Sequence, residues 1–294
     1  MDVYLLDGTY ELFRHHFALP SHVTAENREV AATRGVLGSV LGMLEGGVTH
    51  LGVATDHVIE SFRNEMWPDY KSSAGIDPRL LEQFPLLEEA LEAMGVVVWP
   101  MVDVEADDAL ASAAALAAEA AEVERVYICT PDKDLGQCVR GERVVQLNRR
   151  TRVVLDEAGI VAKFGVGPES IPDYLALVGD SADGYPGLPG WGARSAATVL
   201  ARWPHFEEFP ADCEAWNVNV RGVGQLCLTF GAQRDLANLF RDLATLRSGE
   251  RLFDSVDELR WMGPRPAFEA MARRLEAPEL AERVESASFR RLNS

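Results

Sequence analysis

Carboxylate side chains gather in a few short segments of this 294-residue chain. Acidic side chains repel one another, so a group of them costs free energy unless a cation neutralises it. An all-oxygen ligand set without His or Cys suits Mg²⁺ or Mn²⁺, the ions of phosphodiester chemistry. The residue types therefore predict a metal-dependent nuclease. The acids concerned are Asp7, then Glu105, Asp107 and Asp108, then Asp132 and Asp134, and last Asp180 and Asp183.

The net charge of the chain is strongly negative, at −18, from 46 acidic and 28 basic residues. Nucleic-acid binders usually present a basic surface, so contact with DNA would have to depend on local basic patches and on bound metal. No run of about 18 apolar residues predicts a membrane span. The first residues also lack a basic region followed by an apolar one, as a secretory signal would have. We expect a cytoplasmic protein that does not contact membranes.

Cysteine and histidine show no metal-binding spacing. The four cysteines, Cys129, Cys138, Cys213 and Cys227, form no C-x-x-C pair, and the six histidines form no H-E-x-x-H motif. Zinc is therefore not expected, and the sequence predicts free thiols in a reducing compartment.

The first half of the chain alternates short apolar runs with helical patterns. This alternation predicts an α/β fold with a mostly parallel central sheet flanked by helices. The predicted strands are Val3–Leu6, Leu51–Thr55, Val96–Trp99, Val126–Thr130 and Val144–Leu147, and a hairpin would add Val153–Leu155. The predicted helices between them are Thr33–Leu44, Pro78–Met94 and Ala106–Ala121.

Such a sheet would bring the acids together, because parallel sheets bind ligands beyond the carboxyl ends of their strands. Asp7 ends the first strand, Asp56 ends the second, and Asp132 follows the fourth by two residues. Glu105 follows the third strand and opens the next helix. A purely structural role is the alternative to metal binding. Acids in the first turn of a helix complement the helix dipole, and Asp in a loop often forms a turn.

From Asp156 onward the pattern is helical, which predicts an α/β region over residues 1–155 and a helical region over residues 156–294. The tail from Ser286 to Ser294 is expected to be frayed. The predicted helices are Asp156–Phe164, Glu169–Val178, Ala193–Trp203, Gln233–Arg247 and Pro266–Leu275.

A glycine-rich turn follows the last acidic pair. Gly187, Gly190 and Gly192 precede a helix, and glycines there let backbone N–H groups approach a phosphate at the helix N-terminus. Arg194 and Ser195, in the first turn, would add a charge and a hydroxyl group to that contact. The structural alternative is a plain helical hairpin, since Gly and Pro punctuate any turn.

Taken together, these motifs resemble the 5′-nuclease family, which comprises flap endonucleases and the 5′→3′ exonuclease domain of bacterial repair DNA polymerases. The resemblance runs from residue 1 to about residue 250 and implies a free-standing member without a polymerase domain. It rests on motifs in the family's order: Leu-Leu-Asp7-Gly8, Ser61-Phe62-Arg63-Asn64-Glu65, Tyr70-Lys71, Glu105-Ala106-Asp107-Asp108, Thr130-Pro131-Asp132-Lys133-Asp134-Leu135 and Gly179-Asp180-Ser181-Ala182-Asp183.

The resemblance implies a role for each matching residue. About two or three Mg²⁺ or Mn²⁺ ions would be bound, with Asp56 in their outer shell. Lys71 and Arg63 would contact phosphates near the scissile bond, and Tyr70 would stack on a terminal base. The implied metal ligands are Asp7, Glu105, Asp107, Asp108, Asp132, Asp134, Asp180 and Asp183.

The resemblance also implies two DNA-gripping segments. A helix-3-turn-helix motif at about residues 175–203 would hold duplex DNA and bind K⁺ through the backbone carbonyls of its loop, Gly187–Gly192. An arch at about residues 62–82 would be short and poor in basic residues, since Ser72-Ser73-Ala74-Gly75 stands where the family places another base.

The implied function is a structure-specific 5′ nuclease, a flap endonuclease or 5′→3′ exonuclease of replication or repair. Its substrates would be DNA with 5′ flaps, nicks or single-strand/duplex junctions, and it would act as a monomer. A polymerase and a sliding clamp stay open as protein partners. Two alternatives are a non-catalytic structure-specific DNA-binding protein of the same fold and an RNA-directed PIN-like nuclease.

Overall fold

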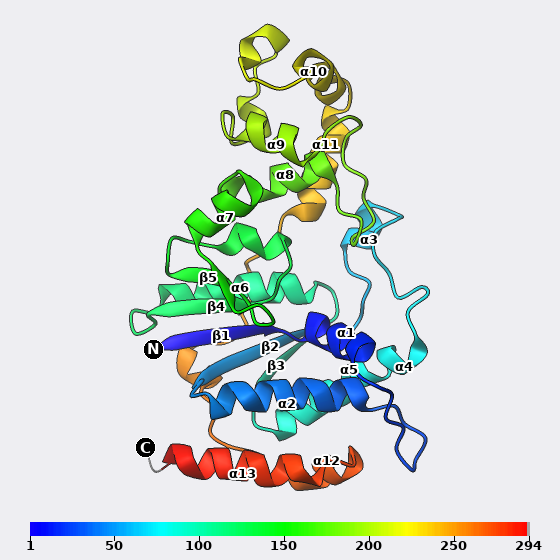
Figure 1. Ribbon diagram of the computed structural model, residues 1–294, viewed down its shortest axis with the longest axis vertical. Helices are drawn as coiled ribbons and strands as arrows, with labels where there is room; N and C mark the ends of the chain where they lie inside the picture. Colours follow the sequence, from blue (N-terminus) through cyan, green and yellow to red (C-terminus); the bar gives the residue numbers. More distant parts are fainter. Residues whose placement is uncertain (293–294) are drawn as a thin grey trace. The chain divides into compact units, whose positions relative to one another are not determined.

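The computed structural model describes residues 1–292 and divides into two compact units (Figure 1). Unit 1 comprises Met1–Ile59, Ser73–Thr130 and Ser248–Ser294, and unit 2 comprises Glu60–Ser72 and Pro131–Arg247. The chain therefore leaves unit 1 twice and returns to it twice. This division differs from the single boundary expected at residue 155, because sequence patterns report local structure and not where a distant segment packs.

Unit 1 is built on four parallel strands: β1 (Asp2–Asp7), β2 (His50–Asp56), β3 (Val97–Met101) and β4 (Arg125–Cys129). Their order is β3-β2-β1-β4, so the first strand in the chain lies inside the sheet. In the register, Leu6 lies opposite Val53 on one side and Cys129 on the other. The predicted parallel sheet is confirmed, and its strands end at a common carboxyl edge.

Helices cover this sheet. α6 (Ala106–Glu119) contacts all four parallel strands, and its alanines, such as the fully buried Ala109 and Ala113, let its backbone approach them closely. α1 (Gly8–Ala18) and α2 (Ala31–Glu45) pack on each other. The helix predicted over Pro78–Met94 is instead two helices, α4 (Pro78–Leu81) and α5 (Gln83–Ala93).

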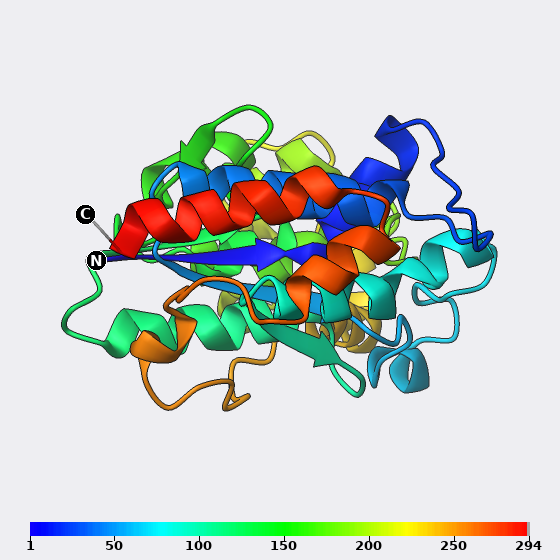
Figure 2. The ribbon, with the colours of Figure 1, turned by 90° about the horizontal axis from the view of Figure 1, so that it is seen from below.

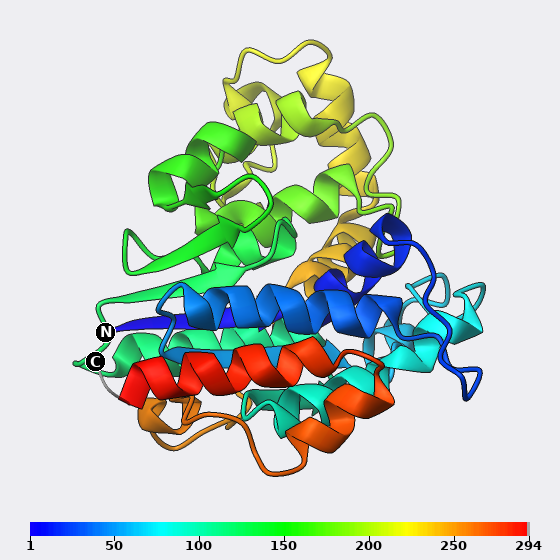
Figure 3. The same cartoon turned by 60° about the horizontal axis from the view of Figure 1, so that its bottom comes forward.

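The end of the chain returns to unit 1. α13 (Pro278–Leu292) lies along α2, and α12 (Phe268–Arg274) packs on α5 (Figures 2 and 3). The tail expected to be frayed is therefore helical through Leu292, and only its last two residues lie outside the described part. Burial of apolar side chains such as Val284, which is fully buried, stabilises this helix.

Unit 2 is mainly helical, as predicted. A hairpin of antiparallel strands, β5 (Val144–Asn148) and β6 (Val153–Leu155), precedes helices α7 to α11. Within residues 1–292 no helix combines the length and the apolar character that crossing a membrane requires. The α-helices of unit 2 are α3 (Arg63–Met66), α7 (Glu157–Phe164), α8 (Ile171–Val178), α9 (Ala193–Leu200), α10 (Val223–Ala232) and α11 (Arg234–Ala244).

A disulfide closes part of unit 2. Cys213 and Cys227 are bonded, with their Cα atoms 5.6 Å apart, whereas Cys129 and Cys138 are not part of a disulfide. The prediction of free thiols is therefore wrong for the bonded pair. Residues that lack any motif spacing can still be brought within bonding distance by the fold, which the sequence alone does not reveal.

Candidate metal centre

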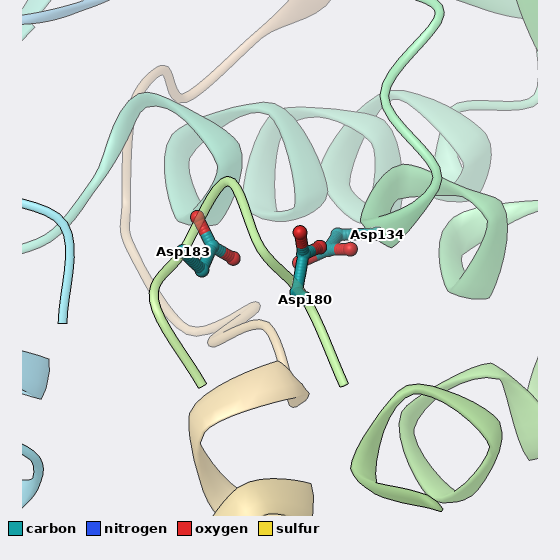
Figure 4. A group of neighbouring side chains, drawn as sticks. All are labelled: Asp134, Asp180 and Asp183. Atoms are coloured by element: carbon teal, nitrogen blue, oxygen red, sulfur yellow. The ribbon is translucent and has the colours of Figure 1, made fainter. Parts of the chain in front are cut away.

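Three of the predicted metal ligands meet in unit 2. Asp134 begins a 3₁₀ helix, η1 (Asp134–Cys138), and Asp180 and Asp183 lie in the loop after α8. One carboxylate oxygen from each residue lies within 4.8 Å of the others. In Figure 4 the three side chains gather around one space, and a single loop carries Asp180 and Asp183. We call Asp134, Asp180 and Asp183 the carboxylate trio.

The loop of the trio is held in a narrow hairpin. The amide N–H of Asp180 donates to the carbonyl of Tyr185 at 2.8 Å, and that of Tyr185 donates back at 3.0 Å. Gly184 has a φ of +85°, and a Cβ atom there would lie 2.0 Å from the carbonyl oxygen of Asp69. Only glycine fits this position, so the turn fixes where both carboxylates of the loop can lie.

Asp134 is electrostatically strained. Burial raises the pKa of its carboxyl group well above the ordinary range, and the negative charges of Asp132, Asp183 and Asp180 raise it further. Its Oδ1 atom is buried and has no hydrogen-bond partner. A buried acceptor without a donor is costly, and a cation would satisfy it. The all-oxygen donors of the trio therefore fit a hard divalent ion such as Mg²⁺ or Mn²⁺.

Two lysines flank the trio. The Nζ atom of Lys133 lies 2.8 Å from Oδ2 of Asp180, and that of Lys71 lies 3.7 Å from Oδ1 of Asp183. Burial disfavours the charged form of Lys133, yet the hydrogen bond and the charge of Asp180 raise its pKa overall. Asp132 accepts a hydrogen bond from the amide of Asp134 at 3.1 Å and so orients the start of η1.

Asp7 lies in unit 1, at the carboxyl end of β1 as predicted. It is buried, with 4% of its surface exposed, and both of its carboxylate oxygens accept hydrogen bonds. Oδ1 accepts from the amide of Tyr10 at 2.7 Å, which caps α1, and Oδ2 accepts from the hydroxyl of Thr130 at 2.8 Å. Asp7 thus joins the ends of β1 and β4 whether or not it also binds metal.

The other acids of unit 1 surround the start of α6. Oδ1 of Asp56 accepts from the amide of Ala106 at 2.7 Å. Glu105 and Asp108 form a capping box, in which the amide of Glu105 donates to Oδ2 of Asp108 at 3.0 Å, and Asp107 is half-buried beside them. Among residues 1–292, only the trio forms a group of three acids with mutually close oxygens. The metal roles of these unit 1 acids stay predictions.

Two predicted DNA contacts conflict with the burial of their side chains. Arg63 is only 1% exposed, and its guanidinium donates to the carbonyls of Leu243 at 2.8 Å and Thr245 at 3.2 Å. Tyr70 is 4% exposed and lies in the apolar core of unit 2. Neither side chain is presented at the surface of this structure, and their DNA contacts stay predictions. The sequence motif does not reveal that these side chains are buried, because their burial depends on segments far along the chain.

The start of α9 borders a cavity of about 740 Å³. Its polar lining includes Arg194 and Ser195, whose DNA contacts stay predictions, and also Arg221, which lies outside the sequence motif. Gly190 and Gly192 also line this cavity. The hydroxyl of Ser195 is hydrogen-bonded to the backbone of Gly192.

Gly187 does not line this cavity; its φ is +71°, and a Cβ there would lie 2.4 Å from the backbone nitrogen of Gly179. It is a glycine because two backbone segments pack together, and not because a phosphate approaches. The helix-3-turn-helix motif as a DNA grip stays a prediction.

The parallel sheet of unit 1 carries acids at its carboxyl edge, and the helical unit 2 carries the carboxylate trio. The chain belongs to the 5′-3′ exonuclease family. Residues 2–165 match the family model of the 5′-3′ exonuclease N-terminal resolvase-like domain, and residues 166–267 match that of the 5′-3′ exonuclease C-terminal SAM fold.

Curated relatives agree with this assignment. The chain is 33% identical over 207 residues to a 5′-3′ exonuclease of Aquifex aeolicus, covering 70% of this chain and 71% of that protein. It is 32% identical over 284 residues to DNA polymerase I of Pseudomonas aeruginosa, covering 92% of this chain. It spans only 30% of that polymerase.

Solved structures share the fold. The T5 D15 protein co-crystallised with metal ions superimposes with a TM-score of 0.65 at 17% identity, covering 98% of this chain and all of that one. The catalytic core of Rad2 in complex with a DNA substrate gives a TM-score of 0.62 at 14% identity, covering 97% of this chain and 91% of that one.

Proposed function

We propose that the chain is a structure-specific 5′ nuclease that hydrolyses phosphodiester bonds of DNA at 5′ flaps, nicks and single-strand/duplex junctions. The observation that carries the proposal is the carboxylate trio, with the buried and unpartnered Oδ1 of Asp134 in it. The name of the Aquifex relative and the DNA in the Rad2 complex support the substrate class.

In this proposal Asp134, Asp180 and Asp183 hold a divalent ion, Mg²⁺ or Mn²⁺. When bound, such an ion activates a water molecule and stabilises the leaving oxygen of an in-line displacement. The side chain of Asp132 holds Asp134 in place by accepting a hydrogen bond from the backbone amide of Asp134. Lys71, whose ammonium group lies 3.7 Å from Asp183, contacts the scissile phosphate.

The acids of unit 1 hold a second ion in this proposal. Asp7, Glu105, Asp107 and Asp108 supply its ligands, with Asp56 in the outer shell. Asp7 lies at the carboxyl end of β1 and Glu105 at the start of α6, and both are almost fully buried oxygen donors of the kind that Mg²⁺ and Mn²⁺ prefer.

Duplex DNA is bound at the N-terminus of α9. Arg194 and Arg221 line the same cavity and would each neutralise a backbone phosphate, which suits a protein whose overall charge is negative. The carbonyls of the Gly187–Gly192 loop would hold a K⁺ ion beside them. The protein acts as a cytoplasmic monomer in replication or repair, with a polymerase or a sliding clamp as its partner.

Cleavage of a 5′-flap DNA duplex with Mg²⁺ or Mn²⁺ tests the function. We expect cleavage by the natural protein and a loss of more than about 100-fold in Asp134→Asn and Asp180→Asn, since each removes a ligand charge. Asp235→Asn, an exposed acid of α11, is the matched control and should cleave normally.

Three results would contradict the proposal. Unchanged cleavage in Asp180→Asn would remove the trio from the active site. Tight binding of the flap without cleavage would identify a non-catalytic DNA-binding protein. Faster cleavage of a matched RNA flap than of the DNA flap would identify an RNA-directed nuclease.

A further inference from the structure

Lysine is rare in this chain and is confined to one unit. Of the 28 Lys and Arg residues, only three are lysines: Lys71, Lys133 and Lys163. All three belong to unit 2, and two of them are ion-paired with the carboxylate trio. Arginine supplies the basic residues elsewhere. The two side chains differ physically, because an ammonium group is a compact point charge, whereas a guanidinium is a wide planar fork.

Lys133 makes the shorter of the two ion pairs. Its Nζ atom lies 2.8 Å from Oδ2 of Asp180, a carboxylate that is only 3% exposed. The other oxygen of Asp180 accepts from the amide of Ala182 at 2.9 Å. The ammonium group therefore lies at the oxygen of Asp180 that accepts no backbone hydrogen bond, where a cation would compete with it.

The lysines pair with only two of the three carboxylates of the trio, those of Asp180 and Asp183. Oδ1 of Asp134 receives no hydrogen bond from either lysine. The lysines thus compensate the site in part and leave one buried carboxylate oxygen that a divalent ion would satisfy.

We propose that Lys133 is a displaceable counter-ion, which takes the place of the divalent ion at Asp180 and has to withdraw when that ion binds. Lys133 thereby weakens metal binding and protects the metal-free loop from repulsion between its carboxylates. This proposal rests on the proposed function, since it requires that the trio binds metal.

The structure offers a place for the withdrawn side chain. Lys133 lines a second cavity of unit 2, of about 570 Å³, whose wall also includes Asp69 and Ser181. The side chain of Lys133 is 35% exposed, so its ammonium group can turn toward this space without losing contact with water. A carboxylate and a hydroxyl group on the cavity wall can accept the ammonium group there.

Isothermal titration with Mn²⁺ tests the competition. We expect Lys133→Met to bind Mn²⁺ about tenfold more tightly than the natural protein, because no ammonium group has to be displaced. Arg202→Met removes one positive charge from the same unit, but the guanidinium of Arg202 lies over the ring of Trp203 at 5.1 Å, and this control should change the affinity less than about twofold. Lys133→Arg keeps the charge and should not bind more tightly.

Amine acylation of the natural protein gives a second test, which no folding defect can disturb. The three lysines fall in different peptides, so mass spectrometry can follow each of them. Saturating Mg²⁺ should raise the labelling rate of Lys133 at least about threefold and leave that of Lys163 unchanged, because a withdrawn amine is no longer shielded by Asp180.

Two results would overturn the proposal. Equal or weaker Mn²⁺ binding by Lys133→Met, or Lys133 labelling that Mg²⁺ leaves unchanged, would assign Lys133 a purely structural role while the metal site stands. If the natural protein shows no Mn²⁺ binding that Asp180→Asn abolishes, the metal site of the proposed function fails, and the displacement of Lys133 fails with it.

Discussion

The indole N–H of Trp67 donates to the carbonyl oxygen of Gly184 at 3.1 Å. This bond ties the segment that carries Lys71 to the hairpin that carries Asp180 and Asp183. The amide of Lys71 adds a second tie by donating to the carbonyl of Asp183 at 3.0 Å. Lys71 is thus positioned against the carboxylate trio by backbone contacts, and not by its flexible side chain.

Replacing Trp67 with Phe should loosen this connection. The substitution keeps an aromatic ring against Phe240, whose centroid lies 5.2 Å from that of Trp67, but removes the donor to Gly184. We expect a loss of about 1 kcal/mol in the free energy of unfolding. Flap cleavage should fall further than Mn²⁺ affinity, since Lys71 moves and the trio stays. Equal losses in the two measurements would argue against this positioning.

Replacing Gly184 with Ala should disrupt the trio itself. The residue would be held at positive φ with its Cβ atom against the carbonyl of Asp69, so the hairpin has to change its conformation. We expect a loss of at least about 1–2 kcal/mol in stability and of most Mn²⁺ binding. Gly141→Ala, also at positive φ but with nothing near its Cβ, separates backbone strain from the clash and should keep Mn²⁺ binding.

The raised pKa of Asp134 predicts how the stability of the metal-free protein depends on pH. A carboxyl group whose pKa is higher in the folded than in the unfolded chain contributes stability that is complete below about pH 3.9 and is lost as pH rises through the folded pKa. Asp134→Asn should therefore raise the Tm at pH 7 in EDTA. That gain should shrink as the pH is lowered toward 4.

Added metal should reverse the effect of this substitution. Metal binds the ionised carboxylate, so Mn²⁺ should stabilise the natural protein at pH 7 and leave Asp134→Asn almost unchanged. Thermal unfolding across pH 4–8, with EDTA or with Mn²⁺, measures both effects. A lower Tm for Asp134→Asn in EDTA at pH 7 would show that the charge of Asp134 is already compensated in the metal-free protein.

The disulfide should stabilise unit 2. Cys213 and Cys227 are 14 residues apart, and closing a loop of about 15 residues contributes about 3 kcal/mol in the chain-entropy model. Cys213→Ser with Cys227→Ser should lower the stability by a similar amount. Thiol titration of the denatured protein should detect two thiols before reduction and four after it. Four thiols before reduction would mean that the bond is not formed in the purified protein.

Arg194 and Arg221 should act on DNA affinity and not on the chemical step. Each contacts backbone phosphate in our proposal, so an alanine variant should weaken binding to flap DNA independently of sequence and reduce the slope of log K against log salt by about 1. Arg202→Ala is a control, since that guanidinium lies over the ring of Trp203 at 5.1 Å. If Arg221→Ala left this slope unchanged, the cavity at α9 would not be part of the DNA-binding surface.

Local patterns were enough to predict the parallel sheet. The runs Val3–Leu6 and Leu51–Thr55 are mostly apolar because these strands are largely buried, and this signal does not depend on distant residues. The trio could also be anticipated, because grouped carboxylates need a cation whatever the fold.

Properties set by distant segments could not be predicted. The motif suggests that Arg63 and Tyr70 contact a ligand, but both side chains are buried. Their burial depends in part on α11 and the residues that follow it. The carbonyl groups that bind Arg63 are about 180 residues away in the chain. Arg221 and the Cys213–Cys227 bond were missed for the same reason, since no spacing rule connects them to the motifs near them in space.

The return of the chain to unit 1 affects how the protein is made. Trp261 donates from its indole N–H to the carbonyl of Met94 at 2.8 Å, and α13 lies along α2. The first 130 residues therefore cannot complete their packing on the ribosome until the last helices emerge. Unit 2 is synthesised in the interval, while the faces of α2 and α5 that the tail will cover are still open to water. Chaperone binding and proteolysis during synthesis should therefore concentrate on these two helices.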